Sequence, residues 1–406
     1  MTYYQLNDNH NEIKPKDFQY MGSNINKDDV LISKTLHKYL NNSKTEIDTH
    51  YNKWDQVKRF TNPYEYIHTQ IPNYKLSVSK YKPLSRSYFK FIEMSNTFSL
   101  LNDFECNNSI NSFHLAEGPG GFIEAIVNLR KNTNDKYYGM TLINSDVNVP
   151  GWQKSQHFLS KNPNVFIEKG ISETGDLLDS DNIVTIYEKY RNSMEIITGD
   201  GGFDFSVDFN QQEKISAKLI FAQICYAIIM QKRGGHFVLK FFDTFTRASI
   251  EMIYILNTFY DEVYITKPNT SRYANSERYI VCKYFKKVHV GDYLSVFQDM
   301  LMLMTSNSYV DSLLNIKIPY YFITKMEEIN AILGQQQLET IVNTLSLIQN
   351  NSKDINNKIE QMISNNIQKC STWCLKNNVN YNKMISLKNS FFDKDEHENK
   401  FYINKL

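Results

Sequence analysis

The chain has 406 residues, with 45 Lys and Arg against 44 Asp and Glu, and its formal net charge of +1 excludes a strongly basic nucleic-acid coat. Hydrophobic residues make up 41% and charged residues 22%, which excludes a chain that is disordered throughout. The longest apolar stretch, residues 219–230, is too short to cross a bilayer, so no membrane partner is expected. The five cysteines form no zinc-ligand cluster, so no metal site is expected and a reducing, cytoplasmic setting is the simplest interpretation, with a nuclear site left open.

The first part of the chain is polar up to about residue 65, and residues 28–40 have the spacing of an amphipathic helix. Residues 66–92 contain no Asp or Glu, while tyrosines and cations alternate there at Tyr66, Tyr74, Lys75, Lys80, Tyr81, Lys82, Arg86, Tyr88 and Lys90. A basic stretch with interleaved aromatic rings can follow RNA phosphates and stack on bases. An ordinary solvated face with core tyrosines is the alternative.

The middle of the chain alternates between strand and helix patterns, which predicts an α/β fold with a mostly parallel sheet. Strands are predicted at 113–116, 136–142, 195–199, 236–242, 262–267 and 278–285, and helices at 121–130, 212–232 and 247–260. The pair Gly234 and Gly235 is expected to stop the long helix. The last two strands leave no room for a helix between them, which predicts an antiparallel closing pair. Beyond residue 300 the pattern is helical, most clearly at 326–349.

A glycine-rich turn follows the first strand of this alternating region. It consists of Glu117, Gly118, Pro119, Gly120, Gly121 and Phe122. Such a turn lets a ligand approach the backbone near a helix N-terminus. It has neither the dinucleotide fingerprint nor a P-loop lysine. Its carboxylate suits a positively charged ligand such as S-adenosylmethionine, and a plain connecting turn is the alternative.

Three charged residues stand at or near predicted strand ends. Asp200 follows a buried strand and is flanked by glycines, and ligands of open α/β sheets bind outside such ends. Lys240 lies in an apolar strand, where a lysine is costly unless it is paired or reaches solvent at the strand mouth. Glu277 stands beside Arg278, where a surface ion pair would be ordinary.

Four motifs occur in order: Gly-Pro-Gly-Gly-Phe, Asp-Gly-Gly-Phe, Gly-Gly-His-Phe-Val-Leu-Lys-Phe-Phe-Asp and Thr-Ser-Arg followed by Asn-Ser-Glu-Arg-Tyr. Over about residues 80–290 they resemble the FtsJ-like ribose 2′-O-methyltransferases, most of all the branch that acts on the mRNA cap. The resemblance implies a Rossmann-like methyltransferase domain at 66–290. An N-terminal extension at 1–65 and a helical C-terminal extension at 291–406 would flank it.

The resemblance also implies a catalytic tetrad of two lysines and two acids. Asp200, Lys240 and Glu277 fall on their motifs, and Lys90 matches the first lysine in the run Ser-Arg-Ser-Tyr-Phe-Lys. A lysine whose pKa is depressed can accept a proton from a ribose hydroxyl, and Lys240 is the candidate for this role. Lys90 would then hold the hydroxyl or the adjacent phosphate, while the two acids orient the amines.

Further contacts are implied by the same resemblance. Asp176 resembles the acidic residue that contacts the adenine of S-adenosyl-L-methionine, and Asp200 borders the same cofactor. His114 stands where many relatives have Asp, so Glu117 is expected to supply the missing carboxylate. The residues expected to contact RNA are Arg86, Ser271, Arg272 and Asn275. For Arg272, an ion pair within the sheet is an equal alternative.

The expected function is therefore S-adenosylmethionine-dependent 2′-O-methylation of the first transcribed nucleotide of capped mRNA, with capped mRNA and other capping or transcription subunits as partners. Together with an excess of Asn, Ile and Lys, this function would fit a large cytoplasmic DNA virus. The first alternative is the same reaction on rRNA or tRNA. The second is a non-catalytic RNA-binding or polymerase-associated module, against which the complete tetrad argues. A nicotinamide dehydrogenase is excluded by the glycine spacing.

Overall fold

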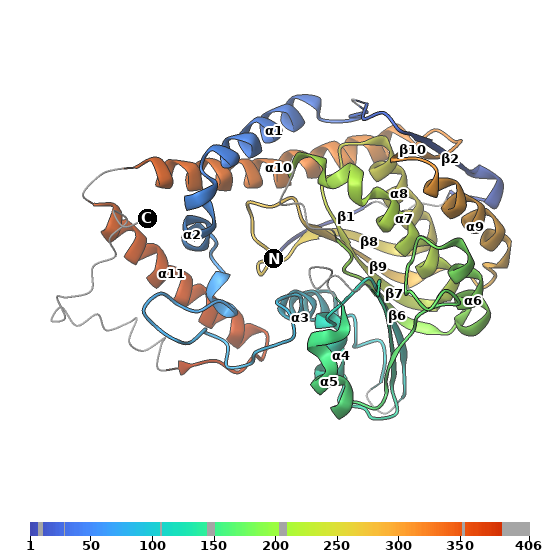
Figure 1. The fold of residues 1–406 in the computed structure, drawn as a ribbon, viewed down its shortest axis with the longest axis horizontal. Coiled ribbons are helices and arrows are strands. Elements are labelled where there is room, and N and C mark those ends of the chain that lie inside the picture. Colours follow the sequence, from blue (N-terminus) through green and yellow to red (C-terminus); the bar gives the residue numbers. More distant parts are fainter. Residues whose placement is uncertain are drawn as a thin grey trace. The chain divides into compact units, whose positions relative to one another are not determined.

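The apolar runs predicted as buried strands lie side by side in one mixed sheet (Figure 1). In spatial order its strands are β1 (Thr2–Gln5), β8 (Tyr260–Lys267), β9 (Arg278–Phe285), β7 (Gln231–Phe241), β6 (Met194–Gly199), β3 (Asn111–Leu115), β4 (Lys136–Met140) and β5 (Val165–Ile167). Neighbours from β7 through β6, β3 and β4 to β5 are parallel, whereas β9 is antiparallel to both β7 and β8. The predicted α/β class and the antiparallel closing strand are thus confirmed.

The structure is a computed structural model that describes residues 1–6, 11–27, 29–105, 108–143, 151–202, 209–350 and 354–383. The chain forms two units that interleave along the sequence. Unit 1 comprises Met1–Lys34, Leu84–Lys267 and Glu277–Ala331, and unit 2 comprises Thr35–Pro83, Pro268–Ser276 and Ile332–Leu406. This division differs from the three consecutive segments drawn from the sequence, because each unit is assembled from separate stretches of chain.

Helices cover both faces of the sheet in unit 1 (Figure 1). They are α3 (Ser87–Phe98), α4 (Gly121–Arg130), α5 (Gln156–Lys161), α6 (Ser180–Tyr190), α7 (Gln212–Met230), α8 (Arg247–Phe259) and α9 (Gly291–Thr305), with short 3-10 turns η1 (Pro15–Asp17), η3 (Trp152–Ser155) and η4 (Phe209–Gln211). On one face α6, α7 and α8 contact one another, and on the other α3 packs against α4. Almost every residue of the second half of α7 is buried, as its continuous apolar sequence predicts.

Two sequence predictions of element boundaries are wrong. The long helix ends at Met230, and the pair Gly234 and Gly235 lies inside β7 instead of stopping the helix. There Gly234 has a φ of +79°, and a Cβ on Gly235 would lie 2.8 Å from the Glu195 carbonyl oxygen. Glycine is therefore needed for an irregular stretch of strand. The helix predicted at 28–40 instead begins at Lys34, as α1 (Lys34–Thr49).

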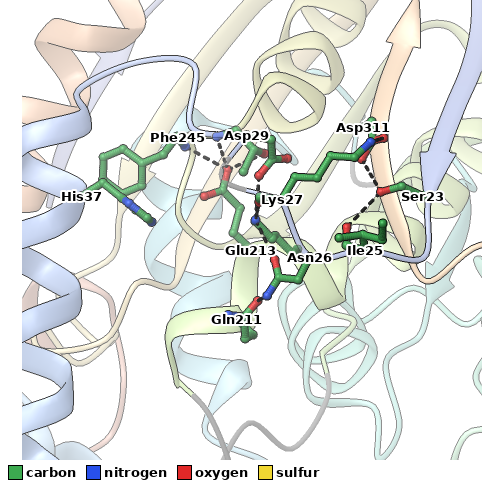
Figure 2. A network of polar contacts seen from close by, with 12 residues as sticks. Ser23, Ile25, Asn26, Lys27, Asp29, His37, Gln211, Glu213, Phe245 and Asp311 are labelled. Atoms are coloured by element: carbon green, nitrogen blue, oxygen red, sulfur yellow. Dashed lines mark hydrogen bonds and ion pairs between the residues drawn. The ribbon is translucent and has the colours of Figure 1, made fainter.

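The N-terminal stretch also contributes strands that its polar sequence did not indicate. Besides β1, it supplies β2 (Phe18–Ser23), which pairs with β10 (Tyr309–Leu314) in a separate two-stranded sheet of unit 1. Polar contacts fix the segment that follows β2 in the chain (Figure 2). The Lys27 Nζ lies 2.9 Å from Asp311, and the Asp29 carboxylate lies 2.7 Å from the Lys214 ammonium.

Unit 2 is built from helices. They are α1, α2 (Tyr51–Thr61), the 3-10 turn η2 (Glu65–Ile67), the part of α10 (Tyr320–Gln349) that follows Ala331, and α11 (Ile355–Lys376). Ile47, Trp54, Ile341 and Leu345 form a shared apolar core. The helices predicted beyond residue 300 are confirmed by α10, although β10 interrupts this region in unit 1. Within the described ranges, no helix combines the length and the apolar composition needed to span a bilayer.

Candidate active site

The described parts of the segments that follow β3, β5 and β6 meet at the carboxyl edge of the sheet. The Asp200 amide donates to the Leu115 carbonyl, 3.3 Å away, which joins the loop after β6 to the end of β3. Gly175, at φ +66°, lies so close to the end of β4 that a Cβ would be 2.1 Å from the Thr141 carbonyl oxygen. Ligands of open α/β sheets bind at this edge. The fold thus places the predicted glycine-rich turn, Asp176 and Asp200 in one region.

Lys90 and Glu277 form a buried ion pair. Lys90 lies on α3, and its Nζ donates to Glu277 Oε1 at 2.6 Å. Only 4% of Lys90 and 9% of Glu277 is exposed. Glu277 immediately precedes β9, whose antiparallel direction brings the start of this strand to the edge where β6 and β7 end. The helix and the strand start therefore converge, as the tetrad requires.

Lys240 and Asp200 form the second pair. Gly199 is paired with Leu239 across β6 and β7, so the next residue on each strand, Asp200 and Lys240, emerge together. The Lys240 Nζ donates to the Asp200 carbonyl oxygen at 2.6 Å and lies 3.4 Å from the Asp200 carboxylate. A Cβ on the exposed Gly202 would come within 3.1 Å of the Lys240 Nζ. Glycine at this position therefore leaves the approach to the amine open.

Tyr279 connects the two pairs, and sequence reasoning missed it. Its hydroxyl donates to the Asp200 carboxylate at 3.0 Å and accepts from the Lys90 Nζ at 3.4 Å. Tyr279 faces Lys240 across β7 and β9 in the strand register. Because side chains alternate along a strand, a residue two positions after Glu277 lies on the same face. The two-residue spacing of Glu277 and Tyr279 was therefore the signal in the sequence that Tyr279 faces the same site.

The electrostatics of the site depend on burial and on neighbouring charge. Burial lowers the pKa of the Lys90 ammonium, and the nearby Arg86 charge lowers it further against the opposing effect of Glu277. Burial alone would raise the pKa of the Glu277 carboxyl, but Lys90, Lys240 and Arg86 outweigh it and hold this pKa well below its ordinary value. Arg86, a predicted RNA contact, is therefore close enough to act on the tetrad.

A second buried lysine, Lys267, borders the tetrad at the end of β8, and the sequence did not single it out. Its Nζ donates to the Glu277 carbonyl oxygen at 2.5 Å. Burial lowers the pKa of Lys267 to about 7, although the Glu277 carboxylate opposes this shift. Lys267 is the last residue of β8 and follows the buried Ile265 and Thr266, so a lysine that closes a strand was the signal in the sequence.

The prediction that Glu117 serves as a ligand carboxylate is not supported by its contacts. One carboxylate oxygen accepts hydrogen bonds from the amides of Phe122 and Ile123, at 2.5 and 2.9 Å. The other accepts from the Thr198 hydroxyl at 2.8 Å and lies 3.1 Å from His114 Nδ1. Glu117 is 3% exposed and satisfies the first amides of α4, so its carboxylate serves as an internal helix cap. His114 belongs to the same closed network.

The rest of the glycine-rich turn shapes the backbone. Gly120 begins α4 with a φ of +100°, which favours glycine, and its amide donates to the Glu117 carbonyl at 2.6 Å. The Gly118–Pro119 peptide is cis, and the Pro119 carbonyl accepts a hydrogen bond from the Ser155 hydroxyl. Phe122 is fully buried and contacts Tyr279 with ring centroids 6.0 Å apart. Its side chain therefore packs against Tyr279, and its contact with the cofactor stays a prediction.

Asp176 and Trp152 flank this turn in a way that fits an aromatic, hydroxyl-bearing cofactor. One Asp176 carboxylate oxygen accepts from the Leu178 amide at 2.9 Å, and the residue is half-buried. The Trp152 indole lies against both Gly120 and Gly139, where a Cβ would be 3.1 and 2.5 Å from its ring atoms. Its buried Nε1 has no hydrogen-bond partner in the part of the chain that the structure describes. The edge therefore offers an aromatic ring, an unsatisfied donor and acidic acceptors.

The remaining predicted RNA contacts, Ser271, Arg272 and Asn275, belong to unit 2. The Arg272 guanidinium makes a two-pronged ion pair with Glu65, with Nη2 and Nε at 2.6 and 3.0 Å from its oxygens. Arg272 thus forms an ion pair, but its partner lies in η2 and not in the sheet as the alternative supposed, and its RNA contact stays a prediction. Ser271 is fully buried, and its RNA contact stays a prediction. Asn275 is half-buried, and its amide closes a turn onto the Arg272 carbonyl at 3.2 Å.

Gly121 fixes the distance between α4 and the start of α3. A Cβ there would lie 2.2 and 2.3 Å from the hydroxyl oxygens of Ser87 and Ser85, and 3.1 Å from the Tyr88 amide nitrogen. Gly121→Ala should therefore displace the N-terminal turn of α3, lower the free energy of unfolding by about 1–3 kcal/mol and reduce turnover by displacing Lys90. Thermal unfolding and single-turnover kinetics measure both effects. Replacing Ser85 and Ser87 by alanine in the same variant should restore part of the stability and part of the turnover. A Gly121→Ala protein with unchanged stability and turnover would contradict this close packing.

Comparisons with known proteins agree with this geometry. Residues 83–285 match the family model described as FtsJ-like methyltransferase. A cap-specific mRNA (nucleoside-2′-O-)-methyltransferase 1A of Caenorhabditis briggsae is 32% identical over 237 residues, covering 54% of this chain and 26% of that protein. The human cap-specific mRNA (nucleoside-2′-O-)-methyltransferase 1 is 35% identical over 213 residues, covering 50% of this chain and 24% of that protein. The corresponding methyltransferase 2 of Pongo abelii is 27% identical over 351 residues, covering 82% of this chain and 44% of that protein. The chain thus spans less than half the length of each of these relatives.

Proposed function

Because the chain belongs to the FtsJ-like methyltransferase family, we propose that it transfers a methyl group from S-adenosyl-L-methionine to a ribose 2′-hydroxyl of RNA. The observation that carries this proposal is the pair of lysine–carboxylate contacts around Tyr279. Lys90 lies 2.6 Å from Glu277, and Lys240 lies 3.4 Å from Asp200. Gathering four charged groups at one edge is costly, and active sites are where such groups gather, as the lowered pKa values of Lys90 and Glu277 illustrate.

The substrate we propose is capped mRNA, methylated on its first transcribed nucleotide. The support comes from the three relatives described above, all of which are named as cap-specific mRNA (nucleoside-2′-O-)-methyltransferases. Other capping or transcription subunits are proposed partners, and a cytoplasmic location is proposed as the simplest setting. The four cysteines among the described residues are free thiols, which suits a reducing compartment.

In the proposed reaction, the 2′-hydroxyl approaches Lys240 over Gly202. The Lys240 amine is the proposed acceptor of the hydroxyl proton as the oxygen forms its bond to the methyl carbon. The Asp200 carbonyl and carboxylate hold the Lys240 Nζ in place, and the carboxylate balances the ammonium that forms. When bound, S-adenosyl-L-methionine would supply the methyl group from its sulfonium, and the electron pair of the broken C–S bond would stay on the sulfur of a neutral thioether.

Lys90 has a positioning role in this scheme. Its Nζ is fixed by Glu277 and Tyr279, and it presents a donor to the hydroxyl or the neighbouring phosphate. Since the transfer requires oxygen, carbon and sulfur in line, a fixed donor supports rate mainly by orientation. The cofactor would be held by the turn after β3, with Asp176 and Trp152 at its adenine and Asp200 beside its charged end.

The experiment that tests this function is methyl transfer from labelled S-adenosylmethionine to a short RNA, in capped and uncapped forms, followed by nuclease mapping of the labelled nucleotide. We expect label on the 2′-oxygen of the first nucleotide, and only in the capped RNA. Label at internal positions or in uncapped RNA would instead identify an enzyme of rRNA or tRNA. If RNA and cofactor both bind but no label is transferred to any RNA, the chain is a non-catalytic RNA-binding module.

A further inference from the structure

Unit 2 contains a hollow that the tetrad does not use. Its volume is about 540 Å³, within the range of about 300–1,000 Å³ typical of ligand pockets. The side chains that matter come from α2 and the loop after η2, and they are Gln56, Arg59, Phe60, Gln70, Tyr74 and Lys75. The whole lining lies within residues 56–75, so one continuous stretch of chain builds the site.

The loop that forms one wall is held by its own hydrogen bonds. The Thr69 amide donates to the Glu65 carbonyl at 3.1 Å, and the amides of Ile71 and Tyr74 donate to the carbonyls of Leu76 and Ile71, both at 3.0 Å. On the other wall, α2 is anchored in the core by the buried Trp54. The hollow is therefore formed before any ligand arrives, which reduces the ordering cost of binding.

The charge of the hollow is positive. Arg59 and Lys75 are both exposed, and no carboxylate is among the lining residues. Within the described ranges neither cation forms an ion pair, whereas the nearest acid of α2, Asp55, is paired with Lys58. Two cations without a counter-ion favour a phosphate, to which guanidinium and ammonium groups both bind.

The other walls suit a nucleobase. Tyr74 is 42% exposed and Phe60 is half-buried, which provides ring surface for stacking. The amides of Gln56 and Gln70 can both donate and accept, as the edge of a base requires. The Tyr66 ring also lines the hollow, and its buried hydroxyl has no hydrogen-bond partner in the described part of the chain.

We propose that this hollow binds one nucleotide of single-stranded RNA, with its phosphate on Arg59 and Lys75 and its base against Tyr74. The proposal rests on the proposed function, because the ligand is part of the RNA substrate of that reaction. An acidic peptide would satisfy the two cations but would leave the exposed ring without a stacking partner. Nucleic acid matches both features at once.

The test measures binding of the full chain to a fluorescent, uncapped 12-nucleotide RNA by anisotropy, over a series of salt concentrations. Tyr74→Ala should weaken binding about tenfold without changing its salt dependence, since stacking releases no counter-ions. Arg59→Ala and Lys75→Ala should each weaken binding and lower the slope of log affinity against log salt by about 0.7. The matched control is Lys38→Ala, an exposed α1 lysine of the same unit outside the hollow, which should bind within twofold of the unchanged chain.

Photocrosslinking with 4-thiouridine in the same RNA should label the peptide that contains Tyr74. The proposal is overturned if the three hollow variants bind RNA like Lys38→Ala. It is also overturned if oligoglutamate displaces the RNA while Tyr74→Ala binds RNA as tightly as the unchanged chain. The occupant would then be an acidic protein segment. Methyl transfer is scored separately. If the hollow variants weaken RNA binding as expected but the chain transfers no methyl group, only the proposed reaction is rejected. If methyl transfer is normal and the hollow variants bind RNA like the unchanged chain, only this site is rejected.

Discussion

Replacing Lys240 by alanine should lower the rate of methyl transfer by at least about a thousandfold while leaving the fold intact. Loss of a general base costs about 10²- to 10⁴-fold, and the same change removes the group that holds the Asp200 end of the site. The side chain lies near the end of β7 beside the exposed Gly202, and its Nζ lies 5.9 Å from the centroid of the Phe242 ring. Single-turnover methyl transfer measures the loss, and circular dichroism with thermal unfolding checks the fold.

The matched control lies on the same strand. Lys232, at the other end of β7, forms an ion pair with Glu195 at 2.6 Å and has a half-exposed side chain. Lys232→Ala removes a lysine side chain from the same strand, and it should retain transfer within about twofold, because Lys232 lies at the end of β7 opposite to the tetrad. Lys240→Arg keeps the charge but cannot give up its proton in the accessible pH range, so it should be as inactive as alanine. Near-normal turnover of folded Lys240→Ala would refute the assigned role.

The second large effect concerns the stability of unit 2. Arg272→Ala should lower its free energy of unfolding by about 3–5 kcal/mol, because the change leaves a buried carboxylate without its cation. The Glu65 side chain is fully buried, and its second oxygen accepts from the Asn62 amide at 2.6 Å. Thermal unfolding of the full chain should show an earlier transition. Arg272→Lys keeps the charge but loses the two-pronged geometry. Its unfolding temperature should lie between those of the unchanged chain and Arg272→Ala.

The pH dependence of this loss has a definite sign. Burial alone would raise the pKa of the Glu65 carboxyl, but Arg272 holds it well below its ordinary value. A lowered pKa stabilises the folded state above the unfolded pKa of about 4.3, and this stabilisation is lost as the pH falls toward the folded pKa. The stability gap between the unchanged chain and Arg272→Ala should therefore be full at pH 7 and narrow progressively below about pH 4. A gap that stays constant down to pH 3 would contradict the ion pair as its cause.

The same variant separates two roles for Arg272. If the guanidinium serves only the ion pair, Arg272→Ala should bind RNA normally at temperatures where unit 2 stays folded. A raised KM for RNA under those conditions would restore the RNA contact that the sequence suggested.

Much of the catalytic geometry was predictable because it depends on strand order. Asp200 follows the buried strand β6, and Lys240 lies near the end of the neighbouring strand β7, so the two residues share one edge of the sheet. Lys90 was different. It lies on α3, where nearly every side chain is buried, and only the family motif pointed to it. A buried lysine in such a helix gives no periodic signal that distinguishes it from the surrounding core.

Other residues could not be assigned from the sequence because their roles depend on hydrogen-bond saturation. Glu117 looked like a ligand carboxylate, but both of its oxygens are occupied by α4 amides, Thr198 and His114. Whether a carboxylate faces a ligand or a helix end is a matter of a few ångströms, which spacing does not encode. The interleaved units were hidden for a similar reason, since contacts between distant stretches leave no mark in local composition.

The path of the chain around Glu277 has a consequence for how variable this region can be. The segment 268–276 belongs to unit 2, while Lys267 before it and Glu277 after it belong to unit 1. The hydrogen bond from Lys267 to the Glu277 carbonyl joins the two ends of this segment. Because this hydrogen bond holds the two ends of the segment 268–276 together, motion within the segment does not move the Glu277 carboxylate. Since the cost of closing a loop grows only slowly with its length, residues 268–276 could lengthen or diverge with little penalty at Glu277. Sequence drift in this segment would then be limited by the Arg272 anchor in unit 2, and only weakly by catalysis.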